Sequence, residues 1–520
     1  MTETVVPPEF ELSYPNVESG VELGPRLQST RIYNTDAVVV GTGAGGAPAA
    51  ARLRDAGYDV LLLEEGGLHL TSSFNTDPLD SAIRLYRDAG TSAILGTPPI
   101  VFAEGRCVGG STVINGGMSW RTPDRVLEHW SRDLNLAGTD PVSMAAYFDE
   151  AEGILNVELQ DPETVGVHSQ LFADGARRLG WELKDNRRNM RRCVGLNNCG
   201  LGCPTGAKQS MLVTEIPRAL NAGAQLVCNA RVNQVLTKRG RAVGVKGHFV
   251  DQLGKKLGRF EVRSRLVVLA AGARFTPAIM LRSRVGGTMV GRGLHTHPNA
   301  KVVGVFDERL DPWIGAHQTH QVHEFLDDGI LMACSAVPPG ILATALPGIG
   351  EGHGRRMSRY NHMMTAACLI EDSGEGRVRL GPDRRPWMTF NLSAQDTETI
   401  HRGVRLLSEL LFMAGARSVL LPFADLPKLE SVDELDRIDA RPRSVKEIEL
   451  LTVHIMSSCR MAIHPSLGPC DAWGRVHDVG GLAIADASLI PSSVGVNPME
   501  TIVALSLRNT DRWIEDLGRE

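Results

Sequence analysis

Several features are missing from this chain of 520 residues, and each absence excludes a class of protein. No apolar stretch approaches the roughly 20 residues that a helix needs to cross a bilayer, so we expect no transmembrane segment. The formal net charge is −5 and no long basic run occurs, which gives no reason to expect nucleic acid as a partner. The first 20 residues lack a charged segment followed by an apolar one, so we expect no secretion signal.

The chain also lacks the cysteine pattern of a disulfide-rich protein. Its nine cysteines are odd in number and lie in a large chain without an export signal, which argues against a disulfide framework. We therefore expect a cytoplasmic protein, with peripheral attachment to a membrane as an alternative. Linkers, repeats and low-complexity segments are absent as well, although 520 residues leave room for two sizeable domains.

Residues 36–67, DAVVVGTGAGGAPAAARLRDAGYDVLLLEEGG, predict a strand, a glycine-rich turn, a helix and a second strand. Gly41, Gly43 and Gly46 have the G-x-G-x-x-G spacing. The first permits a tight turn, the second lets a pyrophosphate approach the backbone, and the third allows close packing of helix and strand. Glu64 ends the second strand, where an acidic residue can accept hydrogen bonds from a ribose. The segment predicts a dinucleotide site without choosing between NAD and FAD.

Five further segments make that choice. They are a second glycine-dense loop at 104–123 (EGRCVGGSTVINGGMSWRTP), a strand–turn–helix pattern at 263–283, VGRGLHTHP from Val290, HIMSSCRMAIHP from His454, and the closing segment at 476–516. With these segments the chain resembles the glucose–methanol–choline (GMC) flavoprotein oxidoreductases, from Asp36 to its C-terminus.

The resemblance implies an α/β fold with a Rossmann-like FAD-binding domain of the GMC type and a substrate-binding domain of mainly antiparallel sheet plus helices. The FAD-binding domain would be discontinuous, built from residues 31–123, 216–304 and 451–520. The substrate-binding domain would comprise residues 124–215 and 305–450. A strand pair and an amphipathic helix in residues 376–416 agree with this, and the apolar stripe of that helix is expected to be core: Val404, Leu407, Leu410 and Leu411.

The resemblance also implies which residues hold FAD. Gly41, Gly43, Gly46 and Glu64 would bind the ADP half, Gly109, Gly110, Ser111, Asn115 and Gly116 would lie against the flavin and pyrophosphate, Val232 would lie beside the adenine, and Asp486 would lie where the last strand of the FAD-binding domain meets the cofactor. Some family members attach FAD through a histidine in the second glycine loop. Residues 105–122 contain no histidine, so we expect noncovalent FAD.

The catalytic pair implied by the resemblance is His454 and Asn497. His454 occupies the histidine position of an H-x-x-G-T-C-x-M-like segment, in which Ser457 and Ser458 replace Gly-Thr here. A neutral histidine can take the hydroxyl proton of an alcohol, and an asparagine can donate a hydrogen bond to the oxygen as charge develops. The flavin N5 would accept the hydride. For Asn497, a turn residue before Pro498 remains the alternative.

Four other histidines are expected to be structural. His295 and His297 lie in an H-x-H-P-like turn that we expect to shape the FAD-binding domain, and His464 and His477 lie near the active-site segment.

Cys193, Cys199 and Cys203 form a C-x5-C-x3-C trio in the segment RRCVGLNNCGLGCPTGAKQS. A structural zinc normally has four ligands, and His168 is only a remote candidate for the fourth, whereas a three-iron cluster needs three thiolates. The segment is similar to one in FAD-dependent glucose dehydrogenase catalytic subunits, which carry a 3Fe-4S cluster, and its tail resembles long-chain alcohol oxidases. We expect a 3Fe-4S cluster, with a structural thiol turn or another metal as alternatives.

Residues 329–350, GILMACSAVPPGILATALPGIG, have almost no charge. They predict an apolar substrate site, a membrane-facing entry, or an ordinary buried strand followed by a loop. On this basis we favour a hydrophobic alcohol, long-chain or sterol-like, over a sugar.

These features predict an FAD-dependent dehydrogenase that oxidises the CH–OH group of a small-molecule alcohol to a carbonyl. Electrons would pass through the cluster to an external acceptor such as a cytochrome, a quinone or a small subunit. Without the cluster, direct reoxidation by oxygen would make the protein an alcohol oxidase. A lyase that keeps the flavin without using its redox chemistry, or a non-catalytic flavin-binding module, are the alternatives from other classes.

Overall fold

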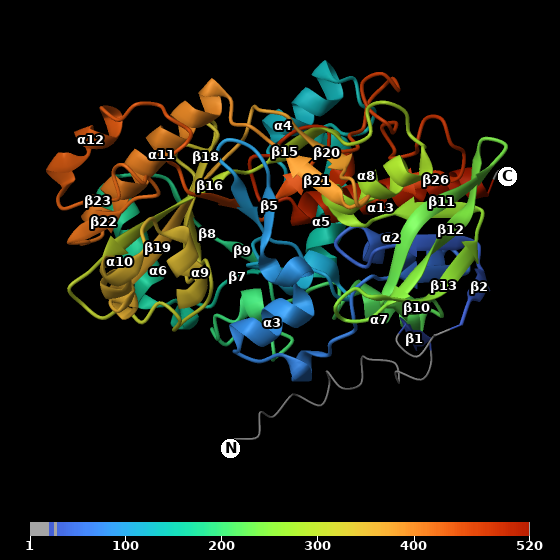
Figure 1. Ribbon diagram of the computed structural model, residues 1–520, viewed down its shortest axis with the longest axis horizontal. Coiled ribbons are helices and arrows are strands. Elements are labelled where there is room, and N and C mark those ends of the chain that lie inside the picture. Colours follow the sequence, from blue (N-terminus) through green and yellow to red (C-terminus); the bar gives the residue numbers. More distant parts are fainter. Residues whose placement is uncertain (1–19, 25–28, 519–520) are drawn as a thin grey trace.

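The computed structural model describes residues 20–24 and 29–518. The stretch in which we expect no secretion signal lies almost wholly outside this part of the chain, as do the last two residues of the predicted FAD-binding domain. Figure 1 shows two halves along the long axis, with the strands of one sheet near α2 and α13 and those of another near α6 and α11. No helix in the described part of the chain is both long and apolar enough to span a bilayer.

A six-stranded parallel sheet forms the core of the first half. Its order is β1 (Val21–Leu23), β10 (Gln225–Cys228), β4 (Val60–Leu63), β3 (Ala37–Val40), β14 (Leu266–Leu269) and β26 (Leu482–Ile484). Every residue of β3, β4 and β14 is buried, as expected for parallel strands covered on both faces. The helix α2 (Gly46–Asp55) packs on β3 and β4 and contacts both α7 (Glu215–Asn221) and α13 (Met499–Leu517). The strand–turn–helix–strand prediction for residues 36–67 is confirmed.

A four-stranded sheet lies beside β14 in the same half. Its order is β11 (Ala230–Lys238), β12 (Arg241–Val250), β13 (Lys256–Arg263) and β2 (Arg31–Asn34).

The second half is organised by a larger, mainly antiparallel sheet. Its strands are β5 (Ser92–Ile94), β6 (Ile100–Phe102), β24 (Leu450–Thr452), β16 (Asn299–Val305), β19 (Met363–Ile370), β18 (Ile330–Ser335), β17 (His320–Val322) and β8 (Leu183–Asp185), with β22 (Ser418–Leu420) and β23 (Lys428–Leu429) attached beside β16. The helices α6 (Val167–Arg178) and α11 (Ala394–Met413) pack together, and α11 also contacts β16 and β19. Val404, Leu407, Leu410 and Leu411 are fully buried, so the predicted core stripe of α11 is confirmed.

The uncharged segment 329–350 begins as an ordinary buried strand. All six residues of β18 are buried between β17 and β19, and the short helix α9 (Pro339–Ala345) follows. The segment therefore gives no support to a hydrophobic substrate, because its strand contributes to the sheet.

A third sheet joins residues that lie far apart in the chain. Its order is β21 (Pro386–Thr389), β20 (Gly376–Leu380), β15 (Arg292–Thr296) and β25 (Ile455–Met456). Pairing of β15 with β25 brings the residue that follows β15, His297, next to the residue that precedes β25, His454.

Sheet membership does not follow the expected domain boundaries everywhere. The six-stranded sheet takes strands from all three predicted pieces of the FAD-binding domain. However, β5 and β6, which lie in the first of these pieces, join the larger antiparallel sheet, and β16 runs across the expected boundary at 304–305. Pairing between strands that lie far apart in the sequence determines which sheet each strand joins. No change in composition marks these boundaries in the sequence.

Candidate active site

The predicted FAD-binding residues gather at the carboxyl edge of the six-stranded sheet. Gly41 follows β3, Glu64 follows β4, and Asp486 comes two residues after β26. In an open parallel sheet the loops at this edge form the ligand crevice. Val232 lies nearby on β11 and is buried; Ala230, where β11 begins, donates its backbone N–H to the carbonyl of Glu64 at 2.7 Å.

The first glycine loop has no room for side chains at two of the predicted positions. Gly41 has φ +108°, and a Cβ there would lie 2.1 Å from the carbonyl oxygen of Ala270. A Cβ on Gly46 would lie 2.0 Å from the carbonyl oxygen of Gly41. Gly45, which the spacing does not single out, is equally confined, because its Cβ would lie 1.4 Å from the carbonyl oxygen of Ala485. Glycine is therefore required by backbone packing at this turn.

Gly43 differs from these glycines because it faces the second glycine loop. A Cβ on Gly43 would lie 4.0 Å from the Cα of Gly110, and one on Gly110 would lie 3.0 Å from the Cα of Gly43. Thr42 joins the two loops, since its hydroxyl accepts a hydrogen bond from the Gly109 N–H at 3.0 Å. Ser111 accepts from the Gly105 N–H at 2.9 Å and so closes the second loop on itself.

Glu64 and Asp486 hold these loops in place with their carboxylates. Glu64 accepts hydrogen bonds from the Thr42 hydroxyl at 2.8 Å and from the Gly66 N–H at 2.8 Å. Asp486 accepts from the Gly272 N–H at 2.9 Å, and its other oxygen accepts from the Ser488 N–H at 2.8 Å. Burial raises the pKa of both carboxyl groups. Oε2 of Glu64 also accepts from the Thr42 N–H at 3.2 Å, whereas Oε1 keeps a lone pair beside its bond from Gly66, so a ribose hydroxyl can still donate to Oε1.

Asn115 supplies a buried polar atom that has no protein partner. Its Nδ2 lies 3.0 Å from the sulfur of Met499, whereas its Oδ1 is buried without a hydrogen bond in the described part of the chain. Gly116, the next residue, has a Cβ position only 2.1 Å from Oε1 of Gln318. Two glycine loops in backbone contact at the carboxyl edge of a parallel sheet, with an unpaired buried acceptor beside them, fit a dinucleotide, so the residues present fit FAD.

The predicted catalytic pair is assembled in the structure. Nδ2 of Asn497 lies 3.4 Å from Nε2 of His454. Asn497 directly precedes Pro498 and α13, whereas His454 lies between β24 and β25, where its backbone N–H donates to the Thr452 hydroxyl at 3.1 Å. As a whole residue, His454 is partly exposed.

His297 is the partner of His454 that the sequence did not reveal. The Nδ1 atoms of the two rings lie 3.0 Å apart, and the rings meet edge to face with their centroids 5.1 Å apart. We expected His297 to shape the FAD-binding domain, but the structure places it directly against the catalytic ring. His295, by contrast, bonds Asp372 at 3.0 Å, and His464 and His477 bond Ser466 and the carbonyl of Ala462, so these three are structural.

The hydrogen bonds around His297 and His454 cannot all form when each ring carries one N–H proton. Burial lowers the pKa of His454 to about 4 and that of His297 well below its usual value, so both rings are neutral near pH 7 and carry one N–H proton each. Asn497 Nδ2 donates toward Nε2 of His454, and the Gly495 N–H donates to Nε2 of His297 at 3.3 Å. Only one ring proton fits between the two Nδ1 atoms. When His454 carries its proton on Nδ1, its Nε2 can accept from Asn497, and His297 must then carry its proton on Nε2, so that the hydrogen bond from the Gly495 N–H is not made.

Gln321 orients Asn497 from the second half of the molecule. Gln321 is buried on β17, and its Nε2 donates to Oδ1 of Asn497 at 3.4 Å, so Nδ2 of Asn497 is turned toward His454. Oε1 of Gln321 lies 3.1 Å from Nε2 of His323, which fixes the direction of the Gln321 amide when that nitrogen carries its proton. Gln321 and Asn497 are 176 residues apart, and no sequence pattern predicted their contact.

Ser457, which stands where the family pattern has glycine, has a backbone conformation that is unfavourable for serine. Its φ is +68°, the left-handed region that glycine adopts without a steric penalty, and its buried hydroxyl has no partner in the described part of the chain. Serine at this position, three residues after His454, therefore holds a conformation that explains why the family pattern has glycine there.

The expected three-thiolate ligand set is not formed. The described part of the chain contains no group of three His, Cys, Asp or Glu side chains placed to hold a metal ion, so the 3Fe-4S prediction finds no fitting site and His168 supplies no further ligand. Two of the thiols have other partners. Cys199 accepts a hydrogen bond from the Arg188 guanidinium at 3.3 Å, and Cys203 accepts one from the Lys208 N–H at 3.4 Å.

Lys208, which lies in the cysteine segment, and Arg188 hold the second glycine loop in place by hydrogen bonds to its backbone. The Lys208 ammonium donates to the carbonyl oxygens of Val113 at 2.7 Å, Asn115 at 2.9 Å and Cys199 at 2.6 Å. Arg188 donates to the carbonyl of Gly116 at 3.0 Å. Both side chains are buried, and burial lowers the pKa of Lys208 to about 8. The segment therefore acts as a thiol-containing turn that holds residues 113–116, the loop that faces the cofactor space.

Comparison with known proteins was consistent with this geometry. Family models described as GMC oxidoreductase match residues 82–299 and 372–506. An uncharacterized GMC-type oxidoreductase of Mycobacterium tuberculosis is 35% identical over 97% of this chain and 80% of its own length. A long-chain-alcohol oxidase of Arabidopsis thaliana is 28% identical over 99% of this chain and 72% of its own. The solved structure of pyridoxine 4-oxidase from Mesorbium loti has a TM-score of 0.68 at 17% identity and covers 92% of this chain and 99% of its own, which shows the same fold.

Replacing Lys208 by methionine should weaken FAD binding by about tenfold or more, because three buried carbonyl groups lose a charged donor. Methionine nearly matches lysine in length, so the change removes the charge and the N–H groups rather than bulk. Isothermal titration of the deflavinated protein with FAD measures the effect. Lys446→Met, at an exposed lysine, is the control and should bind as wild type does. Equal FAD affinity in all three proteins would show that Lys208 does not hold the loop.

Proposed function

Because this chain belongs to the GMC oxidoreductase family, whose members are FAD-dependent oxidoreductases, we propose that it oxidises an alcohol with an apolar chain to the carbonyl compound. The observation that carries the proposal is the convergence of Asn497 Nδ2 and His454 Nε2 beside the cofactor space. An amide donor and an imidazole acceptor at one point fit a hydroxyl group, whose oxygen accepts from the first and whose proton is donated to the second.

His454 would act as the base in this reaction. The substrate hydroxyl would give its proton to Nε2 of His454, while Asn497 stabilises the negative charge that develops on the oxygen. Bound FAD supplies the two-electron acceptor for the hydride that leaves the carbinol carbon. The imidazolium formed on His454 would carry a proton on Nδ1, and Nδ1 of His297, 3.0 Å away, would accept a hydrogen bond from it when His297 carries its own proton on Nε2, in place of the bond from the Gly495 N–H. His297 therefore supports the charge that forms on the base.

The apolar nature of the substrate is supported by the long-chain-alcohol oxidases among the relatives. Their name also supports molecular oxygen as the acceptor that takes the electrons from FAD, in place of the cluster that we expected from the cysteine trio. The fit of Cys199 and Cys203 to a hydrogen-bonded turn agrees with this acceptor, because it gives both thiols a structural role.

His454→Ala should lower the rate of flavin reduction by about 10²- to 10⁴-fold, the usual contribution of a positioned base, while FAD stays bound. Anaerobic stopped-flow mixing with 1-dodecanol, followed by the bleaching of the flavin absorbance, measures this rate. His464→Ala, at an exposed histidine bonded to Ser466, is the matched control and should react as wild type does. A near-normal rate in His454→Ala would remove this residue from the mechanism.

The rate of flavin reduction should be constant between pH 6 and 8 and should fall as the pH drops through about 4, the lowered pKa of His454. The base works only when neutral, so protonation below its pKa removes it. The same low pKa reduces folding stability as the pH falls from about 6.5 to about 4, since the unfolded chain then binds a proton that the folded chain excludes. A pH-jump measurement within seconds separates the two effects.

His297→Leu should reduce the same rate by about tenfold or more at pH 7, because the imidazolium loses its hydrogen-bond acceptor. If instead His297→Leu reacts as fast as wild type with FAD fully bound, the ring contact does not support the base.

Protein purified without oxygen should contain neither iron nor acid-labile sulfide, and should consume oxygen when 1-dodecanol is added. Cys199→Ser should retain that oxygen consumption within about threefold, since a serine hydroxyl can replace the thiol as the acceptor for Arg188. Stoichiometric iron and sulfide in wild type, and their loss in Cys199→Ser, would support the 3Fe-4S cluster and an external electron acceptor instead. Faster turnover of glucose than of 1-dodecanol would contradict the apolar substrate.

A further inference from the structure

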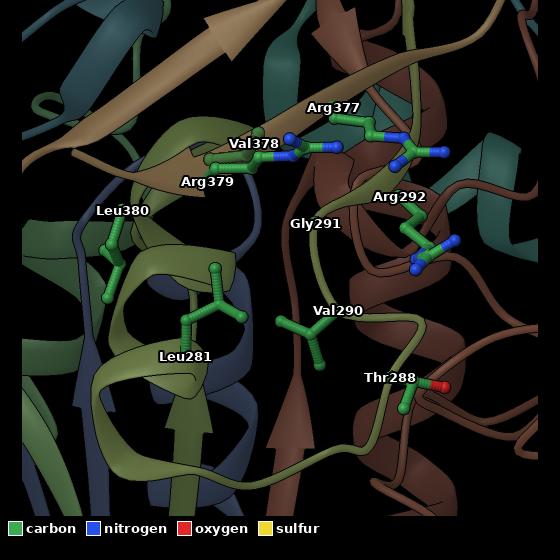
Figure 2. A pocket seen from close by; sticks show the side chains of 9 residues that line it. All are labelled: Leu281, Thr288, Val290, Gly291, Arg292, Arg377, Val378, Arg379 and Leu380. Carbon is green, nitrogen blue, oxygen red and sulfur yellow. The ribbon is translucent and has the colours of Figure 1, made fainter.

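A pocket of about 360 Å³ lies between the end of α8 (Gly272–Ser283) and the antiparallel strands β15 and β20, and neither His454 nor Asn497 lines it. Figure 2 shows Leu281 and Val290 pointing toward one another across it, with Arg292, Arg377 and Arg379 together on the side of the strands. Its volume lies at the lower end of the range for small-molecule sites, about 300–1,000 Å³. One wall is therefore apolar and the other carries three guanidinium groups.

Strand register places the three arginines on the same face of their sheet. Arg292 of β15 and Arg377 of β20 are direct cross-strand partners. Arg379 follows Arg377 by two residues, and side chains two apart on a strand share a face. Side chains directly opposite one another in an antiparallel pair have Cβ atoms about 4.5–5.5 Å apart, and like charges in such a pair destabilise the sheet.

Carboxylates do not offset this charge. Among the residues that the structure describes, none of the three arginines forms an ion pair, and the nearest acidic residues in sequence are engaged elsewhere: Glu375 pairs with Arg460 and Asp383 with Arg385. The two segments that form the pocket, residues 281–292 and 376–385, hold seven arginines and one acidic residue in a chain whose net charge is −5. The local excess of positive charge is therefore specific to this surface.

We propose that this pocket binds the phosphate group of an organic phosphate whose carbon chain lies against Leu281 and Val290. A phosphate monoester carries a charge of about −1.5 to −2 near pH 7, which a single carboxylate cannot match against three guanidinium groups. Arginine binds phosphate oxygens through two parallel N–H groups, and the planar fork suits an exposed rim. The apolar wall favours an ester over inorganic phosphate. A bound phosphate also relieves the repulsion between Arg292 and Arg377.

Titration of the FAD-loaded protein with hexyl phosphate at constant ionic strength tests the site, with inorganic phosphate as the second ligand. Wild type should bind hexyl phosphate more tightly than inorganic phosphate. Arg377→Gln and Arg379→Gln should each weaken hexyl phosphate by about tenfold or more, the loss expected for a hydrogen bond to a charged group. Leu281→Ala should weaken the binding of hexyl phosphate and leave that of inorganic phosphate unchanged. Arg259→Gln, at an exposed arginine of β13 outside the pocket, is the matched control.

Vesicles of phosphatidylcholine with and without phosphatidic acid distinguish a soluble ester from a lipid headgroup. Wild type that sediments with the phosphatidic acid vesicles, and Arg377→Gln that does not, would support the phosphate site and identify its ligand as a lipid headgroup. Retained flavin absorbance and alcohol-dependent flavin reduction show that each variant is folded. The proposal is overturned if both arginine variants bind hexyl phosphate and vesicles as Arg259→Gln does. Because the pocket is separate from His454, that result would leave the proposed oxidation untouched.

Discussion

The close approach of two glycine loops at the edge of the parallel sheet is the constraint on which the rest of the site depends. Gly43 and Gly110 meet so closely that a Cβ on the second would lie 3.0 Å from the backbone of the first. This approach joins the two loops into one backbone surface at the carboxyl edge of the sheet, where a dinucleotide binds in folds of this kind. Hydrogen bonds from the side chains of Thr42, Glu64 and Asp486 hold the loops and the neighbouring turns. The two carboxylates therefore stabilise this edge of the sheet in addition to any contact with FAD.

A second layer of interactions holds this edge from outside. Lys208 and Arg188 are buried cations that donate to backbone carbonyl groups of residues 113–116, and such charged donors form stronger hydrogen bonds than neutral ones. The cysteine segment thus has a defined place even without a metal: it carries Lys208 and presents the Cys199 thiol and carbonyl to the two cations. A sequence pattern that indicates ligands can equally arise where a turn must bring several polar groups to one loop.

The fold class and the glycine loops at the carboxyl edge of the sheet were largely predictable because their signals are local. Buried strands appear as apolar runs, and backbone turns that exclude a Cβ appear as glycines, so β3, α2, β4, β14 and α8 follow from short segments. His454 and Asn497 were found through the resemblance of their flanking residues to a family. The domain boundaries, the role of the cysteines and the function of residues 329–350 were not predictable in this way. Each depends on which distant strand or side chain lies alongside.

The sequence by itself determined the main elements of this protein and the residue types at its glycine loops, and it predicted His454 and Asn497 as a catalytic pair, because these signals depend on the covalent neighbourhood of each residue. Only the tertiary structure decided that His297 contacts His454, that Gln321 contacts Asn497, and that Arg292 faces Arg377. Those contacts join residues separated by 85 to 176 positions, and their geometry is set by strand register and loop packing, for which no short segment carries a signal.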